Sequence, residues 1–168
     1  MKTRSGTAMK AAVYKGPGEI AVEEVPVPEV GPRDVLLRVD AVGICGSDLH
    51  VYRKGMYDAE PGRIMGHEFS GTVVERGPEV TGIEIDDRAT GFSVEYCGEC
   101  YWCKHGQVRL CPELFDGYTG YGVPGAMAEF VVIRDAEVGA NYFPVPEGLS
   151  NEVAAMAEPL GTAIYTSF

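Results

Sequence analysis

The sequence contains few basic residues, few histidines and no long apolar run. Its 168 residues include 14 Lys and Arg and 25 Asp and Glu, which gives a formal net charge of −11. There are three His. So acidic a chain lacks the clustered positive charge that neutralises phosphates, which excludes a nucleic-acid partner. No apolar run approaches the roughly 20 residues needed to span a bilayer. Because no signal-peptide core follows Met1 either, we expect no membrane partner and a cytoplasmic location.

The hydrophobic content favours one globular domain. Hydrophobic residues make up 45% of the chain, enough to bury a core, and single domains usually have about 100–200 residues. We assign residues 1–8 to an extension or a remnant of expression and residues 9–168 to the domain. Short strands punctuated by Gly and Pro are expected at 11–14, 20–25, 35–42, 69–75, 88–92 and 127–133. Dense short strands of this kind predict a mainly β fold, a partly open β-barrel with few helices.

A helix is expected at the end of the chain, over residues 151–166, with Asn151 near its start. Pro159 lies inside this segment. A proline there removes a backbone donor and clashes with the preceding turn, so it should kink or break the helix next to Glu158.

Four of the five cysteines lie close together in the sequence. They are Cys97, Cys100, Cys103 and Cys111. Two-residue gaps between the first three let tight turns aim the sulfurs at one point, and a fourth thiolate completes a closed, structural zinc site. An iron–sulfur cluster is the alternative, because sets of four cysteines also bind iron. We expect metal to substitute for a core in the lobe at about residues 95–113, and His105 within it to be exposed.

The fifth cysteine belongs to a second candidate metal site. Cys45 follows a hydrophobic strand, and His67 and Glu68 precede another β-rich stretch. A catalytic zinc takes three protein ligands and keeps its fourth position for water or substrate. Since the chain has no sixth cysteine, the third ligand must be a carboxylate or a histidine. The candidates are Glu68 and Glu158.

The order and separation of these segments resemble the zinc-dependent medium-chain alcohol and polyol dehydrogenases. The matching segments are Met9-Lys10-Ala11-Ala12-Val13-Tyr14, Gly43-Ile44-Cys45-Gly46-Ser47-Asp48-Leu49-His50, Gly66-His67-Glu68-Phe69-Ser70-Gly71, the four-cysteine loop and Gly125-Ala126-Met127-Ala128-Glu129-Phe130. The resemblance covers nearly the whole chain from Met9 onward. It implies a GroES-like catalytic domain with a zinc-binding lobe, most similar to the sorbitol, butanediol and threonine dehydrogenase branch.

The resemblance also implies metal ligands. Cys45 and His67 would bind the catalytic zinc, and Glu158 would take the place of the family's third ligand. Glu68 would approach the metal from behind and exchange with water. Asp48 would fix the tautomer and orientation of the zinc-bound histidine.

Proton transfer is assigned through the same resemblance. Zinc lowers the pKa of a bound hydroxyl, and Ser47 and His50 would relay the alcohol's proton to solvent, with Glu68 as a further catalytic residue. Two simpler interpretations stay open: Ser47 as the N-cap of a short helix over residues 48–54, and His50 as a surface residue of that helix.

One turn departs from the family pattern. The family usually has Gly-Asp-Arg-Val, whereas this chain has Asp86-Asp87-Arg88-Ala89. Aspartate tolerates left-handed backbone geometry better than most residues, so the substitution should be accommodated.

Hydride transfer needs a nicotinamide cofactor, which this family binds on a separate Rossmann domain. Two glycine patterns imitate the dinucleotide fingerprint, at residues 120–125 and 16–21. Neither follows a strand and opens a helix, so we expect both to be turns and assign no cofactor-binding residue. Because the chain stops at Phe168, we expect it to lack the Rossmann domain and to be inactive alone.

The resulting hypothesis is the catalytic domain of an oxidoreductase with one catalytic and one structural zinc. It would oxidise a secondary alcohol, polyol or sugar with NAD or NADP. Its other partners would be a separate cofactor-binding domain and, in a homo-oligomer, further copies of the chain. The alternatives are a non-enzymatic zinc-binding or interaction module, and a zinc hydrolase or hydratase that needs no nicotinamide.

Overall fold

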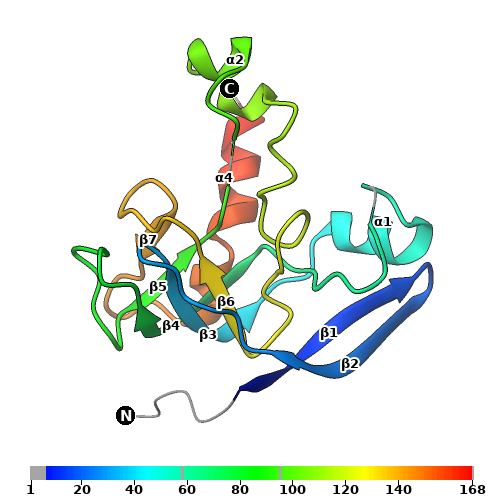
Figure 1. The fold of residues 1–168 in the computed structure, drawn as a ribbon, viewed down its shortest axis with the longest axis horizontal. Helices are drawn as coiled ribbons and strands as arrows, with labels where there is room; N and C mark the ends of the chain where they lie inside the picture. The colour runs from blue at the N-terminus through cyan, green and yellow to red at the C-terminus, as the bar shows by residue number, and fades with distance from the viewer. Residues whose placement is uncertain (1–6, 58, 95, 168) are drawn as a thin grey trace.

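The computed structural model describes residues 7–57, 59–94 and 96–167. Its described strands form an antiparallel hairpin and an antiparallel five-stranded sheet of order β6-β3-β4-β5-β7 (Figure 1). The strands are β1 Ala8–Gly16, β2 Glu19–Pro26, β3 Val35–Val42, β4 Phe69–Arg76, β5 Arg88–Gly91, β6 Phe130–Ile133 and β7 Tyr142–Pro144. The helices are α1 Gly46–Lys54, α2 Tyr101–Lys104, the 3₁₀ helix η1 Val108–Leu110, α3 Asn151–Ala155 and α4 Ala157–Tyr165. The predicted mainly β fold with short helices is confirmed.

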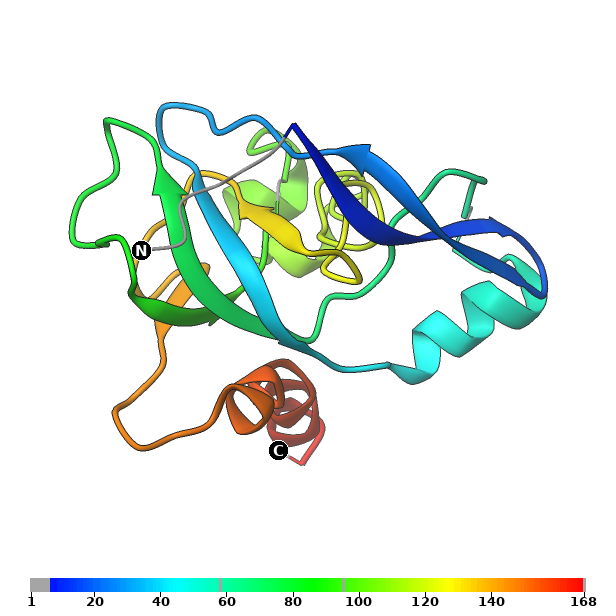
Figure 2. The same ribbon diagram turned by 90° about the horizontal axis from the view of Figure 1, so that it is seen from below.

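The hairpin is joined to the rest of the domain by isolated bridges. Ala11 pairs with Ala128, and Val13 pairs with Ile64. In both views α1 lies beside the hairpin, at the end away from β5 and β7 (Figures 1 and 2). β6 and β7 occupy the two edges of the five-stranded sheet, so the described ladder does not close on itself. This open arrangement agrees with the partly open barrel expected from the sequence.

Strand β3 is buried on both faces. Val35 and Leu37 belong to the main core, whereas Leu36, which points the other way, packs with the inward residues of the hairpin. All three are fully buried. Two buried faces explain why the start of β3 is a continuous apolar run and does not alternate with polar residues.

The observed strand limits differ from the expected ones at two places. The strand expected at 127–133 begins only at Phe130, because the preceding residues bond to β1: the Ala12 N–H donates to the Met127 carbonyl at 2.8 Å. Strand β7 was not expected. It has three residues and ends in Pro144, too short for an alternating pattern to be visible in the sequence.

Both glycine patterns form turns, as expected. Residues 16–18 close the β1–β2 hairpin, and residues 119–123 form a turn bounded by a bridge. Asp86 adopts a φ of 72°, the left-handed geometry that aspartate tolerates. β1 begins at Ala8, inside the stretch assigned to an extension, while residues 1–6 lie outside the described part. No described helix is long and apolar enough to cross a membrane.

The expected C-terminal helix is broken into α3 and α4 at Met156. Pro159 lies in the first turn of α4, where backbone N–H groups have no partner within the helix, so its missing N–H does not destabilise α4. In one continuous helix, however, residue 159 would donate to the Ala155 carbonyl, and a proline cannot do so. The break therefore lies before Glu158, where the proline removes the bond that a continuous helix would need.

Helix α3 is anchored to the sheet through Asn151. The Ser70 hydroxyl of β4 donates to the Asn151 carbonyl at 2.7 Å, and the Arg88 Nε of β5 donates to its Oδ1 at 3.0 Å. The Asn151 Nδ2 donates at 3.1 Å to the Oδ2 of Asp40 in β3, which lies 111 residues earlier in the chain. Polar contacts from three strand regions thus hold the first turn of this helix.

Gly71 gives a stability prediction. A Cβ at this position in β4 would collide with the Arg38 carbonyl of β3. Gly71→Ala is therefore expected to lower the free energy of unfolding by about 1–3 kcal/mol, measured by urea denaturation. Gly161→Ala is the matched control, since its Cβ would meet nothing within 4 Å in α4, and it should raise stability by about 0.4–1 kcal/mol. Equal effects of the two substitutions would contradict the prediction.

Candidate metal centres

The pairing of β3 with β4 creates the first centre. Val42, the last residue of β3, pairs with Phe69, the first residue of β4. Cys45 lies just beyond β3 and His67 just before β4, so antiparallel pairing brings them to the same place. Ligand atoms of Cys45, His67 and Glu68 all lie within 4.8 Å of one another.

The backbone is shaped to admit the Glu68 side chain. The Gly43 N–H donates to the Glu68 carbonyl at 2.6 Å, and a Cβ on Gly43 would collide with the Glu68 carboxylate. His67 and Glu68 are 4% and 7% exposed. An ionisable pair this deeply buried needs a compensating partner, and a thiol, an imidazole and a carboxylate form a donor set that suits zinc.

Asp48 connects the ligand-bearing loop to the histidine. The Cys45 N–H donates to the Asp48 carboxylate at 2.9 Å, and Cys45 is the residue that caps α1. The interpretation of Ser47 as the N-cap is therefore wrong, although the short helix itself is present. Burial raises the pKa of Asp48, and hydrogen bonds from the backbone of Cys45 and the charge of His67 oppose that rise.

The buried His67 Nδ1 has no hydrogen-bond partner among the described residues and lies 4.0 Å from the Asp48 Oδ1. A histidine that binds a metal through one nitrogen commonly faces a carboxylate with the other. His67 thus has the potential metal ligands Cys45 and Glu68 nearby and the buried carboxylate of Asp48 close to its Nδ1, which fits a metal-bound imidazole.

Glu158 lies outside this three-residue group but faces it from α4. Its carboxylate is half-buried. Burial raises the pKa of Glu158; the His67 charge opposes the rise and the Glu68 charge adds to it. The structure therefore brings Glu68, of the two candidate third ligands, into one group with Cys45 and His67. Glu158 lies outside that group but is close enough to interact electrostatically with His67 and Glu68.

A cavity of about 450 Å³ adjoins Glu158 between β5 and α4. Its walls are largely apolar, with the rings of Phe92, Tyr118 and Phe143 and the hydroxyls of Thr90 and Thr162. Phe92 and Tyr118 stack nearly parallel, with ring centroids 6.1 Å apart. A pocket of this size and lining can hold a small organic molecule.

The two expected relay residues have different surroundings. The Tyr121 hydroxyl donates to the half-buried Ser47 Oγ at 2.7 Å. His50 is exposed on α1, and no hydrogen bond joins it to Ser47 within the described residues. Ser47 and His50 lie three residues apart on α1, without a direct hydrogen bond between them among the described residues.

Aromatic residues around His67 were missed by the sequence analysis. The ring of Tyr121 lies 5.2 Å from that of His67, and the ring of Tyr118 lies 6.3 Å from it. Burial is the main cause that raises the pKa of Tyr121, so its hydroxyl keeps its proton near neutral pH. The available signal was the pair of tyrosines in Tyr118-Thr119-Gly120-Tyr121, at the start of a segment that the sequence analysis treated only as a turn.

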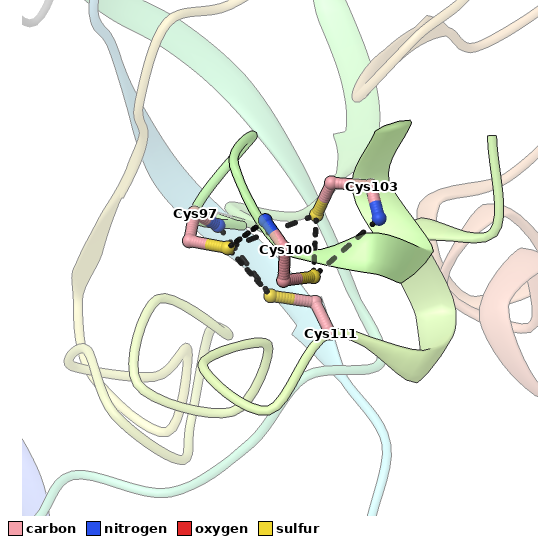
Figure 3. Close-up of side chains that lie close together, drawn as sticks. All are labelled: Cys97, Cys100, Cys103 and Cys111. Atoms are coloured by element: carbon pink, nitrogen blue, oxygen red, sulfur yellow. Dashed lines mark hydrogen bonds between the residues drawn. The ribbon is translucent and has the colours of Figure 1, made fainter. Parts of the chain in front are cut away.

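The second centre lies in the lobe, where the four thiols point toward one another (Figure 3). Sulfur separations include 3.5 Å for Cys100 to Cys103, 3.6 Å for Cys97 to Cys111 and 3.9 Å for Cys97 to Cys103. Sulfurs at the corners of a tetrahedron around zinc, with Zn–S bonds of about 2.3 Å, lie about 3.8 Å apart. The spacing favours a single metal ion over a cluster in which each cysteine binds a different iron.

The four thiols also affect one another's protonation. Backbone hydrogen bonds from Cys100 and Glu99 lower the pKa of Cys97 to about 7. Burial and the hydrogen bond with the Cys100 thiol raise the pKa of Cys103 to about 12. Four thiolates this close repel each other without a cation, so a divalent metal is the natural counter-charge.

The lobe has almost no core of its own. Between residues 96 and 113, all of which are described, Cys111 alone is buried. His105 is exposed, as expected, and its ring stacks on Tyr101 with centroids 4.1 Å apart. Figure 1 shows the lobe and α4 projecting from the same side of the sheet, and Figure 2 shows them at separate places. The lobe therefore gains little stability from packing on its neighbours.

Comparison with known proteins identifies the family. The family model of the alcohol dehydrogenase GroES-like domain matches residues 31–147. The chain belongs to this family. The GroES-like fold and the family membership expected from the sequence are thereby confirmed.

Relatives of this GroES-like domain include L-threonine 3-dehydrogenase of Rhizobium etli, 37% identical over 95% of the chain and 46% of the relative. The structure of acetophenone reductase from Geotrichum candidum in complex with NAD is 28% identical, with a TM-score of 0.76 over 91% of this chain and 44% of that one. The cobalt- and zinc-bound alcohol dehydrogenase from Pyrobaculum aerophilum is 30% identical, with a TM-score of 0.73 over 89% and 44%. The chain thus spans less than half the length of each of these proteins.

The lobe of this GroES-like domain gives a metal prediction. Cys103→Ser should lower the zinc content by about one ion per chain and increase hydrogen exchange across residues 96–113, because metal replaces a core there. Zinc is measured by mass spectrometry and exchange by proteolytic peptides. Cys45→Ser is the control: it should also lose zinc but leave exchange in the lobe unchanged. Unchanged zinc content in Cys103→Ser would refute the prediction.

Proposed function

We propose that this chain is the zinc-binding catalytic part of an NAD(P)-dependent dehydrogenase that oxidises a secondary alcohol, polyol or sugar. The observation that carries the proposal is the convergence of Cys45, His67 and Glu68. An apolar cavity is linked to this group through Tyr118, which lines the cavity and whose ring lies 6.3 Å from that of His67. Family membership supports it, as do the names of the relatives, which refer to a hydroxy amino acid, to a ketone and to alcohol dehydrogenation.

Cys45 and His67 would hold the metal together with one carboxylate, from Glu68 or from Glu158. Bound zinc supplies a Lewis acid that lowers the pKa of an alcohol's hydroxyl. Asp48 would orient the imidazole of His67 from behind. In the lobe, Cys97, Cys100, Cys103 and Cys111 would hold a structural zinc, whose closed set of four thiolates leaves no position for a substrate.

Ser47 would accept the alcohol's proton, and the exposed His50 would return it to solvent. The apolar cavity would hold the part of the substrate that does not react and would exclude water from the reacting carbon. A neutral serine suits the first step because it can accept and donate a proton at once.

The nicotinamide must come from outside the described fold, whose sheets are antiparallel and carry no dinucleotide fingerprint at the start of a helix. A nicotinamide-binding domain, and further copies of the chain, are the expected protein partners. A cytoplasmic location belongs to the same proposal. It is supported by five free cysteines, which persist in a reducing compartment.

The test is an assay of the full-length gene product that carries this chain, loaded with zinc. Reduction of NAD or NADP should depend on the addition of a secondary alcohol, polyol or sugar, and Cys45→Ser should abolish it. A protein with two zinc ions that oxidises none of these substrates would overturn the proposal. Turnover without nicotinamide would instead favour a hydrolase or hydratase. If Cys45→Ser changed no activity of the protein, a non-enzymatic module would be favoured.

The same protein distinguishes the two candidate third ligands. Glu68 lies within the group formed with Cys45 and His67, whereas Glu158 lies on α4, outside that group, and interacts electrostatically with His67 and Glu68. The carboxylate that binds the zinc should, on substitution by Gln, lower zinc affinity by about 10-fold or more. The other substitution should leave affinity within about 2-fold. Competition with a zinc chelator measures both, and equal affinities for both variants and the wild type would exclude a carboxylate ligand.

A further inference from the structure

The hydrogen bond between Tyr121 and Ser47 joins two segments 74 residues apart. The turn that carries Tyr121 is built to approach His67: a Cβ on Gly120 would lie 2.8 Å from the Gly66 carbonyl oxygen. Gly120 has a φ of 80°, and a Cβ on the following Gly122 would collide with the Asp116 carbonyl. Glycine is thus required on both sides of Tyr121 for this close docking.

The Tyr121 ring is held from several sides. Its centroid lies 5.5 Å from that of Phe115, 5.7 Å from those of Tyr57 and Tyr118, and 5.2 Å from that of His67. Packed rings leave the phenol little freedom to rotate or withdraw. Its hydroxyl is therefore a fixed donor aimed at α1.

Ser47 gains a defined orientation from this donor. A serine hydroxyl has one hydrogen and two lone pairs, and rotates freely when it has no partner. The Tyr121 hydroxyl occupies one lone pair at 2.7 Å. The other lone pair and the hydrogen remain for the substrate and for the next proton acceptor.

We propose that Tyr121 is the positioning residue of Ser47, which it holds in one rotamer to receive the proton of the substrate alcohol. The inference rests on the proposed function, because it assigns Ser47 a proton-accepting role. The alcohol's O–H bond breaks as its proton passes to the Ser47 oxygen, and the hydrogen of Ser47 leaves toward solvent. Tyr121 stays neutral and bound to Ser47 throughout.

The kinetic test is a double-mutant cycle in the full-length protein. Tyr121→Phe removes the hydroxyl and keeps the ring, and should lower kcat about 10-fold with KM changed by less than about 2-fold. In the Ser47→Ala background the same substitution should change kcat by less than about 2-fold. Tyr57→Phe, which removes a hydroxyl from a ring that packs on Tyr121, is the matched control and should retain wild-type kcat. Equal losses from Tyr121→Phe in both backgrounds would show a packing role and overturn the inference.

Crystal structures give a second readout that does not depend on activity. Ser47 should occupy one rotamer in the wild type and in Tyr57→Phe, and more than one in Tyr121→Phe. An unchanged single rotamer in Tyr121→Phe would also overturn the inference. If the wild type oxidises no alcohol, the proposed function fails, and the rotamer comparison still decides whether Tyr121 positions Ser47.

Discussion

The register between β3 and β4 is the constraint on which the first metal centre depends. It pairs Val42 with Phe69, and the loops beyond these residues carry Cys45 and His67. Side chains alternate along a strand, so a slip of one residue would turn the apolar side chains of β4 to the wrong face and displace both ligands together. Burial of Phe69 and Val73 in the main core opposes such a slip. The core therefore determines the position of the site as well as the stability of the sheet.

The two metal centres obtain their geometry in different ways. The first inherits its geometry from the sheet, whose ladder and core hold the ligand loops in place. The second has no such support, since Cys111 is the single buried residue of the lobe between residues 96 and 113. Its thiols are arranged by local turns, with backbone N–H groups of Cys97, Cys100 and Cys103 directed at neighbouring sulfurs. Loss of metal should accordingly affect the lobe more than the sheet.

Much of this could be predicted from the sequence, for identifiable reasons. β3 was predicted with correct limits because its apolar start and its alternating second half are bounded by turns. The four-cysteine site was predicted because the spacing of its cysteines is a local signal. β7 was missed because three residues carry no period. Tyr121 was missed because its role depends on a contact with Ser47, distant in sequence, which no local pattern records. The break at Met156 arises from a proline three residues further on, so its position required the hydrogen-bond geometry of the helix.

The break between α3 and α4 means that the two candidate carboxylates are attached differently to the sheet. Asn151 ties α3 to β5 and to the neighbourhood of β3, whereas Glu158 lies beyond the interruption at Met156. Glu68 directly precedes β4, and the Gly43 N–H donates to its carbonyl at 2.6 Å. A tilt of α4 about Met156 would displace Glu158 and would break no ladder bond of the described sheet, because α4 forms none. A rearrangement that tilts α4 would thus alter the charge facing His67 without disturbing the loops that carry His67 and Cys45.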